Sequence, residues 1–172
     1  DAFLRTNPSQ EQRNEAGRKL VRAWYRLLYA GRVLYADPHP GNFLFMPDGR
    51  LFFTVQADNF IGTLDPKAPN GAIKLVESPT VNSRPYGVRL TSKGVPFFDE
   101  FNSNKIASAD PKTLVITEYP LPNKEAGPRR IAIGKDDTVW YGDYARGFLG
   151  HLDPKTGKVE EFASPGGPDS KP

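Results

Sequence analysis

The sequence predicts a mainly β fold, an incomplete β-propeller of about three four-stranded antiparallel blades that follows one N-terminal α-helix. Two observations support this fold class. A stretch of about forty residues, from Pro85 to Pro122, recurs from Pro128 to Pro165 at an offset of 43. Each copy contains four short segments in which apolar and polar residues alternate. A repeat of this length with four strands in each copy is typical of propeller blades.

The first expected element is a helix over residues 9–30. Ser9 can cap its start, because a serine oxygen accepts hydrogen bonds from the first N–H groups of a helix. Gly31 can end it, because glycine tolerates the left-handed turn that often stops a helix. The apolar stripe of this helix consists of Leu20, Trp24, Leu27 and Leu28.

A β-hairpin is expected next. Beyond residue 40 the hydrophobic period shortens from 3.6 to 2, as in the Phe-Leu-Phe segment at 43–45. A Pro-Asp-Gly turn at 47–49 follows, and it leads into a second apolar segment. We therefore expect residues 42–46 to pair with residues 50–55.

Eight strands are expected in the two full repeats, at about residues 86–91, 95–100, 105–109, 115–119, 129–134, 138–143, 148–152 and 158–162. An Asp-Pro-Lys-Thr turn, which starts at Asp110 and at Asp153, joins the third strand of each copy to the fourth. Aspartate can accept hydrogen bonds from the backbone ahead of it, and proline presets φ at the next position. The aromatic pairs at 97–98 and 140–141 are expected to pack between neighbouring blades.

A third copy of the repeat lies upstream at an offset of 45, where Phe52, Asn59 and Asp65 match Phe97, Asn104 and Asp110. The same offset, extended backward, gives residues 42–46 the register of an innermost strand. We therefore expect a hybrid blade over residues 40–79, followed by blades over 85–122 and 128–165.

Composition excludes several classes of protein. The net charge of the 172 residues is +3, but residues 48–172 carry sixteen basic and sixteen acidic side chains, so no nucleic-acid-binding surface is indicated. The chain has no cysteine, which excludes disulfides and thiolate metal sites. No apolar run approaches the ~20 residues of a membrane span. The sequence shows no signal peptide, and although it does not decide the compartment, it favours the cytoplasm.

The repeats resemble a known family. The strings RPYGVRLTSKGVPFFDEFNSNKIASADPKT and GPRRIAIGKDDTVWYGDYARGFLGHLDPKTGKVEEF are similar to blades of the virginiamycin B lyase (streptogramin lyase) family, over about residues 48–172. The resemblance implies that full-length members are seven-bladed propellers. It further implies a Mg-dependent carbon-oxygen lyase that opens streptogramin B-type cyclic esters by elimination, with a Mg ion and a histidine base.

The same resemblance supplies candidate site residues. The family's histidine follows the proline that opens a blade, but the matching positions of the two full repeats hold Tyr86 and Arg129. His151 is then the candidate base, with surface packing as its structural alternative. Glu100 and Asp143 follow the aromatic pairs and are candidate Mg ligands, with Glu100 also a candidate catalytic group. The alternative for both is a solvated strand end.

The string YADPHPGNFLFMPDGRL, residues 35–51, is similar to the catalytic-loop region of the UbiB-like atypical kinase family, and the resemblance covers about residues 9–51. It implies that Asp37 corresponds to the kinase catalytic aspartate and Asn42 to the metal-binding, cofactor-binding asparagine. Phosphoryl transfer also needs a Gly-rich loop, a lysine and a second Mg ligand. Because none of these follows in the expected pattern, active kinase chemistry is not expected.

These observations give three hypotheses of function. The favoured one is a fragment of a virginiamycin B lyase-like propeller that lacks the full catalytic machinery and acts as a scaffold or binding module for an unidentified small molecule. The second is a UbiB-like atypical kinase or ATP-binding remnant. The third is an engineered or recombined chimera without evolved activity. Whichever function applies, we expect residues 1–39 to form the N-terminal helix and kinase-like loop and residues 40–172 to form the propeller-like blades. Since known propellers close with about four to eight blades, self-association through open blade faces is expected unless the helix covers one end.

Overall fold

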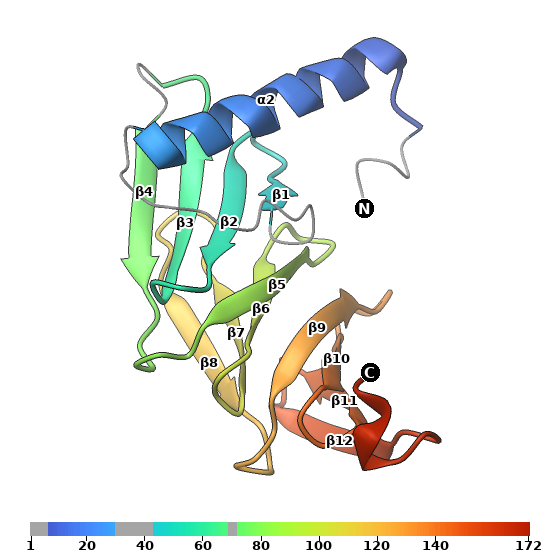
Figure 1. Ribbon diagram of the computed structural model, residues 1–172. Coiled ribbons are helices and arrows are strands. Elements are labelled where there is room, and N and C mark those ends of the chain that lie inside the picture. Colours follow the sequence, from blue (N-terminus) through green and yellow to red (C-terminus); the bar gives the residue numbers. More distant parts are fainter. Residues whose placement is uncertain (1–6, 30–42, 69–71) are drawn as a thin grey trace.

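The computed structural model describes residues 7–29, 43–68 and 72–172 of the chain (Figure 1). Within these residues one long helix precedes three four-stranded antiparallel sheets, which we call blades 1, 2 and 3. Each sheet keeps its four strands in chain order. This architecture confirms the predicted mainly β fold, a partial β-propeller preceded by a helix.

Helix α2 extends over Gln10–Tyr29. Blade 1 consists of β1 (Phe43–Phe45), β2 (Leu51–Val55), β3 (Phe60–Asp65) and β4 (Ala72–Glu77). Blade 2 consists of β5 (Pro85–Leu90), β6 (Pro96–Glu100), β7 (Lys105–Ala109) and β8 (Ile116–Pro120). Blade 3 consists of β9 (Pro128–Ile133), β10 (Val139–Asp143), β11 (Phe148–Asp153) and β12 (Lys158–Ala163), and a short 3-10 helix, η2 (Pro168–Ser170), follows it. The ends of all eight strands predicted for the two full repeats lie within one residue of their expected positions.

Local sequence accounts for the start of α2 and for the first hairpin. The Ser9 hydroxyl accepts a hydrogen bond from the Gln12 amide at 3.3 Å, and the Gln12 side chain accepts one from the Ser9 amide at 2.7 Å, so the predicted cap is a reciprocal capping box. Strand β1 pairs with β2, with Phe43 opposite Phe53. The predicted hairpin is therefore confirmed for residues 43–45, whereas residues 40–42 and Gly31 lie outside the described part of the chain.

The Asp-Pro-Lys-Thr turns have the predicted chemistry. Asp110 Oδ1 accepts hydrogen bonds from the amides of Lys112 and Thr113 at 2.9 and 2.7 Å, and Asp153 Oδ1 accepts one from the Lys155 amide at 2.9 Å. These backbone donors lower the pKa of both aspartates below its usual value, because they stabilise the ionised form. The turn is therefore held by its first residue in both full repeats.

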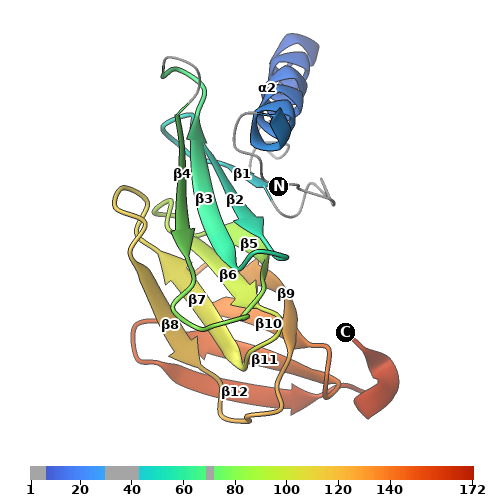
Figure 2. The ribbon, with the colours of Figure 1, turned by 60° about the vertical axis from the view of Figure 1, so that its left-hand side comes forward.

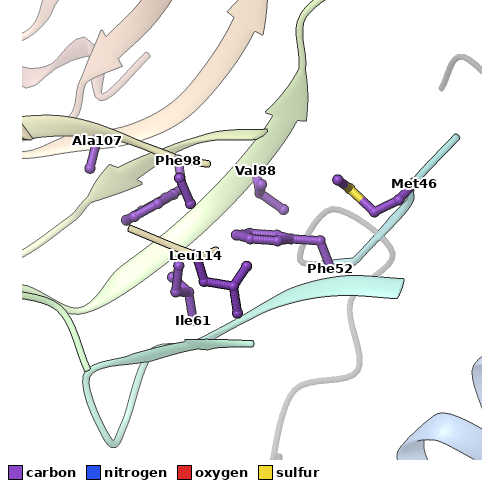
Figure 3. Packing of buried hydrophobic residues seen from close by; sticks show 8 residues of the cluster. Met46, Phe52, Ile61, Val88, Phe98, Ala107 and Leu114 are labelled. Carbon is purple, nitrogen blue, oxygen red and sulfur yellow. The ribbon is translucent and has the colours of Figure 1, made fainter. Parts of the chain in front are cut away.

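Most of the core lies between neighbouring blades. Blades 1 and 2 enclose one buried cluster, in which Phe52 and Phe98 have ring centroids 6.4 Å apart (Figure 3). Blades 2 and 3 enclose another, which includes Phe97 and Tyr141. The predicted packing of the aromatic pairs is thus correct for Phe97, Phe98 and Tyr141. It is wrong for Trp140, which lies on the face of blade 3 away from blade 2 and stacks on Phe162.

The two outermost blade faces differ. On blade 1, the face away from blade 2 carries a third apolar cluster in which Leu51, Phe53 and Leu64 are at most 2% exposed. Both ribbon views place α2 alongside blade 1 on the side away from blade 2 (Figures 1 and 2). On blade 3, Leu149 and Phe162 remain 43% and 49% exposed.

Of the helices that the structure describes, none is long and apolar enough to cross a membrane.

Candidate functional site

Glu100 is the last residue of β6, and its side chain is completely buried. One carboxylate oxygen accepts hydrogen bonds from the hydroxyls of Ser78 and Ser83, the latter at 3.1 Å. The other accepts one from the Ser103 hydroxyl at 3.2 Å. Because Ser78 and Ser83 belong to the segment between blades 1 and 2, Glu100 holds that segment against blade 2. The alternative of a solvated strand end is therefore wrong for this residue.

A second residue supports the same segment. Asn59, which is buried and has a positive φ of 63°, donates from its amide to the Thr80 carbonyl at 2.9 Å. Its side-chain oxygen accepts hydrogen bonds from the Ser83 hydroxyl at 2.9 Å and from the Arg84 amide at 3.1 Å. Burial raises the pKa of Glu100 above its usual value, although the Ser78 hydroxyl opposes this effect. The arrangement is a closed polar network between two blades.

Asp143 occupies the same repeat position in blade 3 and is also completely buried. Its Oδ1 accepts hydrogen bonds from the amides of Gly127, Ala145 and Arg146, at 2.9, 3.2 and 3.2 Å. Its Oδ2 contacts the Arg146 guanidinium at 3.2 Å, and that guanidinium also reaches Glu161 at 3.2 Å. The solvated alternative is wrong here too, since Asp143 ties the start of blade 3 to the turn that follows β10.

Glu100 and Asp143 are the two carboxylates that the sequence analysis named as candidate Mg ligands. Magnesium is held in proteins by carboxylates that face water or substrate and leave room for further oxygen ligands. Both oxygens of Glu100 and of Asp143 already accept hydrogen bonds in buried networks, so neither side chain fits that requirement. In the described part of the chain, no three His, Asp or Glu side chains converge as a metal site would need.

Asp99 is a buried carboxyl that the sequence patterns did not single out. Its Oδ2 accepts a hydrogen bond from the Gly87 amide at 3.0 Å, whereas Oδ1 is the buried side-chain atom of the described residues that lacks a hydrogen-bond partner. Burial raises the pKa of Asp99 well above its usual range, against the opposing charge of Arg89 and then of Arg129. The repeat contains a pattern that could have indicated Asp99. Gly87 and Asp99 of blade 2 correspond to Arg130 and Gly142 of blade 3, so in both blades a glycine lies opposite a larger residue of the neighbouring strand.

Tyr86 and Arg129 follow the opening prolines of blades 2 and 3, and the structure brings them together. The centre of the Arg129 guanidinium lies 6.0 Å from the Tyr86 ring centroid, 5.8 Å from that of Phe101 and 4.5 Å from that of Tyr144. We call these four residues the Arg129 cluster. Phe101 and Tyr144 are themselves repeat-equivalent, so each of the two blades contributes the same two positions. Arg130, the next residue of β9, is exposed, which agrees with the alternation of adjacent strand residues between two faces.

His151, the candidate base, lies on β11, the third strand of blade 3. Its ring packs on that of Trp140, with centroids 4.4 Å apart. Its Nδ1 is 3.7 Å from Glu160. These contacts correspond to the packing alternative for His151. The second histidine, His39, follows Pro38 and lies outside the described residues, as do the kinase-like candidates Asp37 and Asn42.

The blades and their repeat-equivalent positions define the class of protein: a β-propeller-type repeat protein built from four-stranded antiparallel blades. Comparison with known proteins defines the family. A model described as the virginiamycin B lyase family matches residues 32–172, and the chain belongs to that family. The match begins before residue 35 and therefore includes the string quoted for the kinase resemblance.

Three relatives illustrate the membership. The virginiamycin B lyase of Nocardia farcinica (strain IFM 10152) is 27% identical over 127 residues, which cover 67% of this chain and 44% of that protein. The crystal structure of a catalytically inactive virginiamycin B lyase from Staphylococcus aureus, with a histidine replaced by alanine and with quinupristin, has a TM-score of 0.68 and 32% identity over 80% of this chain and 46% of that chain. A streptogramin B lyase structure has a TM-score of 0.64 and 30% identity, and it covers 72% of this chain and 40% of that chain.

The chain spans less than half the length of these relatives. None of the three is described as a kinase, so the UbiB-like resemblance and the chimera hypothesis gain no support from them. The family of the scaffold is therefore shown.

Proposed function

We propose that this chain by itself is a scaffold or binding module of the virginiamycin B lyase family and does not carry out the ring-opening reaction. The observation that supports this proposal is the Arg129 cluster. The strand positions that the sequence resemblance associates with a histidine base hold Tyr86 and Arg129, packed against each other. Arginine stays protonated at ordinary pH and cannot act as a base.

The carboxylates support the same proposal. An elimination needs a base over the acidic proton and an electrophile on the developing enolate oxygen. Glu100 and Asp143 are completely buried and spend their oxygens on hydrogen bonds that hold the blades together. In this proposal both are structural residues, and neither binds the Mg ion that the sequence resemblance implies.

The direct test is a ring-opening assay on a streptogramin B-type cyclic ester with added Mg²⁺, followed by mass spectrometry of the opened product. A full-length virginiamycin B lyase serves as the positive control. We expect no turnover above the uncatalysed rate. Turnover that requires Mg²⁺ and disappears in Glu100→Ala, with the exposed Glu125→Ala as the surface control, would overturn the proposal.

The scaffold role also includes self-association, which the open face of blade 3 favours. Leu149 and Phe162 are 43% and 49% exposed there, and Phe162 stacks on Trp140 at 6.3 Å. The equivalent residues of blade 2, Ile106 and Tyr119, are packed against blade 3. A repeat position that is covered in one blade and open in the next is a natural contact surface for a second copy.

Sedimentation velocity over a range of concentrations tests this part of the proposal. We expect reversible association that Leu149→Ser and Phe162→Ser together abolish. The control is Val115→Ser, because Val115 is 65% exposed but lies outside this face. A monomer at all concentrations, or equal loss in the control, would contradict self-association through blade 3.

A further inference from the structure

The Arg129 cluster combines a cation with aromatic surface. Tyr86 and Phe101 have ring centroids 6.3 Å apart, and Phe101 meets Tyr144 edge-on at 6.2 Å. The three rings therefore form one continuous aromatic surface, and the Arg129 guanidinium lies against it. All four side chains are partly exposed. The junction of blades 2 and 3 thus presents a positive charge and ring faces to solvent together.

The hydrogen-bond donors of this cluster are unused. Among the described residues, no acceptor lies within hydrogen-bond or ion-pair distance of the Arg129 guanidinium, and the hydroxyls of Tyr86 and Tyr144 make no hydrogen bond to protein. A guanidinium has five N–H donors in a planar fork that matches a carboxylate or a phosphate. Stacking on the rings restricts its orientation and leaves those donors available to a ligand.

No carboxylate of the residues that the structure describes forms an ion pair with Arg129. Asp143 is occupied by Arg146, whose Nη1 lies 3.2 Å from its Oδ2. Asp99 accepts its one hydrogen bond from the Gly87 amide, and its charge would attract Arg89 and Arg129, but it forms no ion pair with Arg129. Lys171 adds a second positive charge, 5.4 Å from the Tyr144 ring centroid. Arg129 and Lys171 therefore both place a positive charge against the Tyr144 ring.

We propose that the Arg129 cluster binds a small oxyanion that carries an aromatic ring, with the carboxylate or phosphate on the Arg129 fork and the ring against Tyr144 and Phe101. This inference rests on the proposed binding role of the chain and names its ligand class. Two blades form the site together, because each contributes the residue after its opening proline and the first residue after its second strand.

Calorimetric titration of the whole chain tests the proposal with three probes: phenyl phosphate, benzoate and phenol. We expect saturable binding of one or both anions and none of phenol. Arg129→Gln should weaken anion binding about tenfold or more, since it removes a charge-assisted hydrogen-bond fork. The matched control is Arg130→Gln, which removes the same charge from the next residue on β9 and should change affinity less than about twofold.

Two further variants keep the test decisive. Arg129→Lys keeps the charge but loses the fork, so it should bind phenyl phosphate more weakly than the natural chain, with an unchanged unfolding temperature. Tyr144→Leu should weaken phenyl phosphate more than inorganic phosphate. Absence of saturation, or equal losses in Arg129→Gln and Arg130→Gln, would overturn the site. Antibiotic turnover would overturn the proposed function but not a measured titration, so the two failures are distinguishable.

Discussion

Glu100 and Asp143 occupy the same position of two successive blades, are equally buried, and yet have different partners. The longer Glu100 reaches three serine hydroxyls, two of them in the segment that leads into blade 2. The shorter Asp143 stays close to the backbone and accepts three amide hydrogen bonds. The change from Glu to Asp accompanies the loss of these serines in blade 3, so a side-chain network is replaced by a backbone clamp. Blade 1 has Val55 at this position, inside an apolar cluster.

Residues at equivalent positions of the repeat therefore occupy the same place in their blades but have different surroundings. The same holds for the blade faces. Ile106 is completely buried between blades 2 and 3, while the equivalent Leu149 is 43% exposed on the far side of blade 3. Both are apolar residues at the same position of the third strand, and the presence or absence of a following blade makes the difference.

The largest expected effect tests the comparison of the two faces. Ile106→Ala should lower the free energy of unfolding by about 2–5 kcal/mol, because it leaves a cavity between two blades. Leu149→Ala should cost less than about 1 kcal/mol, because half-exposed apolar area contributes less. Urea denaturation followed by tryptophan fluorescence measures both. Equal losses would show that the blade 3 face is covered in solution.

A smaller effect tests the comparison of the two carboxylates. Glu100→Ala should cost about 1–3 kcal/mol, because it leaves buried serine hydroxyls without an acceptor. Glu100→Gln should cost clearly less, since the amide oxygen still accepts hydrogen bonds and the change removes a charge whose burial is unfavourable. The same pair of changes at Asp143 should differ less, because Asp143→Asn also weakens the contact with Arg146. If Gln proved as costly as Ala at position 100, the hydroxyl network would not be the main role of Glu100.

The smallest effect concerns Asp99 and its dependence on pH. Because the pKa of Asp99 in the folded chain is raised well above the ordinary 3.8, the folded state holds this proton more tightly than the unfolded state does. Stability from this group is therefore present below about pH 4 and falls as pH rises towards the folded pKa. Asp99→Asn should flatten that part of the stability profile while keeping an acceptor for the Gly87 amide. Thermal unfolding between pH 4 and pH 8 checks this, and an unchanged slope in the variant would contradict it.

Several elements could be predicted because their causes are local. The Ser9 cap and the Asp110 and Asp153 turns depend on residues within four positions of one another, and the strands alternate with period 2. The burial of Glu100 could not be predicted in this way. A carboxylate at a strand end is solvated in an isolated hairpin, and only the segment containing Ser78 and Ser83 removes it from water.

The Arg129 cluster shows the same limit. Adjacent residues of a strand alternate between its two faces, and Arg129 is partly buried while Arg130 is exposed. The sequence does not indicate that Tyr86, Phe101 and Tyr144 surround Arg129, because these rings come from a strand and a turn of blade 2 and from a turn of blade 3.

By itself, the sequence determined the helix, the hairpin, the repeat and the virginiamycin B lyase-type blades of this chain, since periodicity and turn chemistry act over a few residues. The tertiary structure alone decided which faces are covered, which carboxylates are buried and which side chains meet at the junction of blades 2 and 3. Burial is the physical reason, because it depends on what an adjacent blade or segment places against a residue, and that neighbour lies roughly one repeat away in the chain.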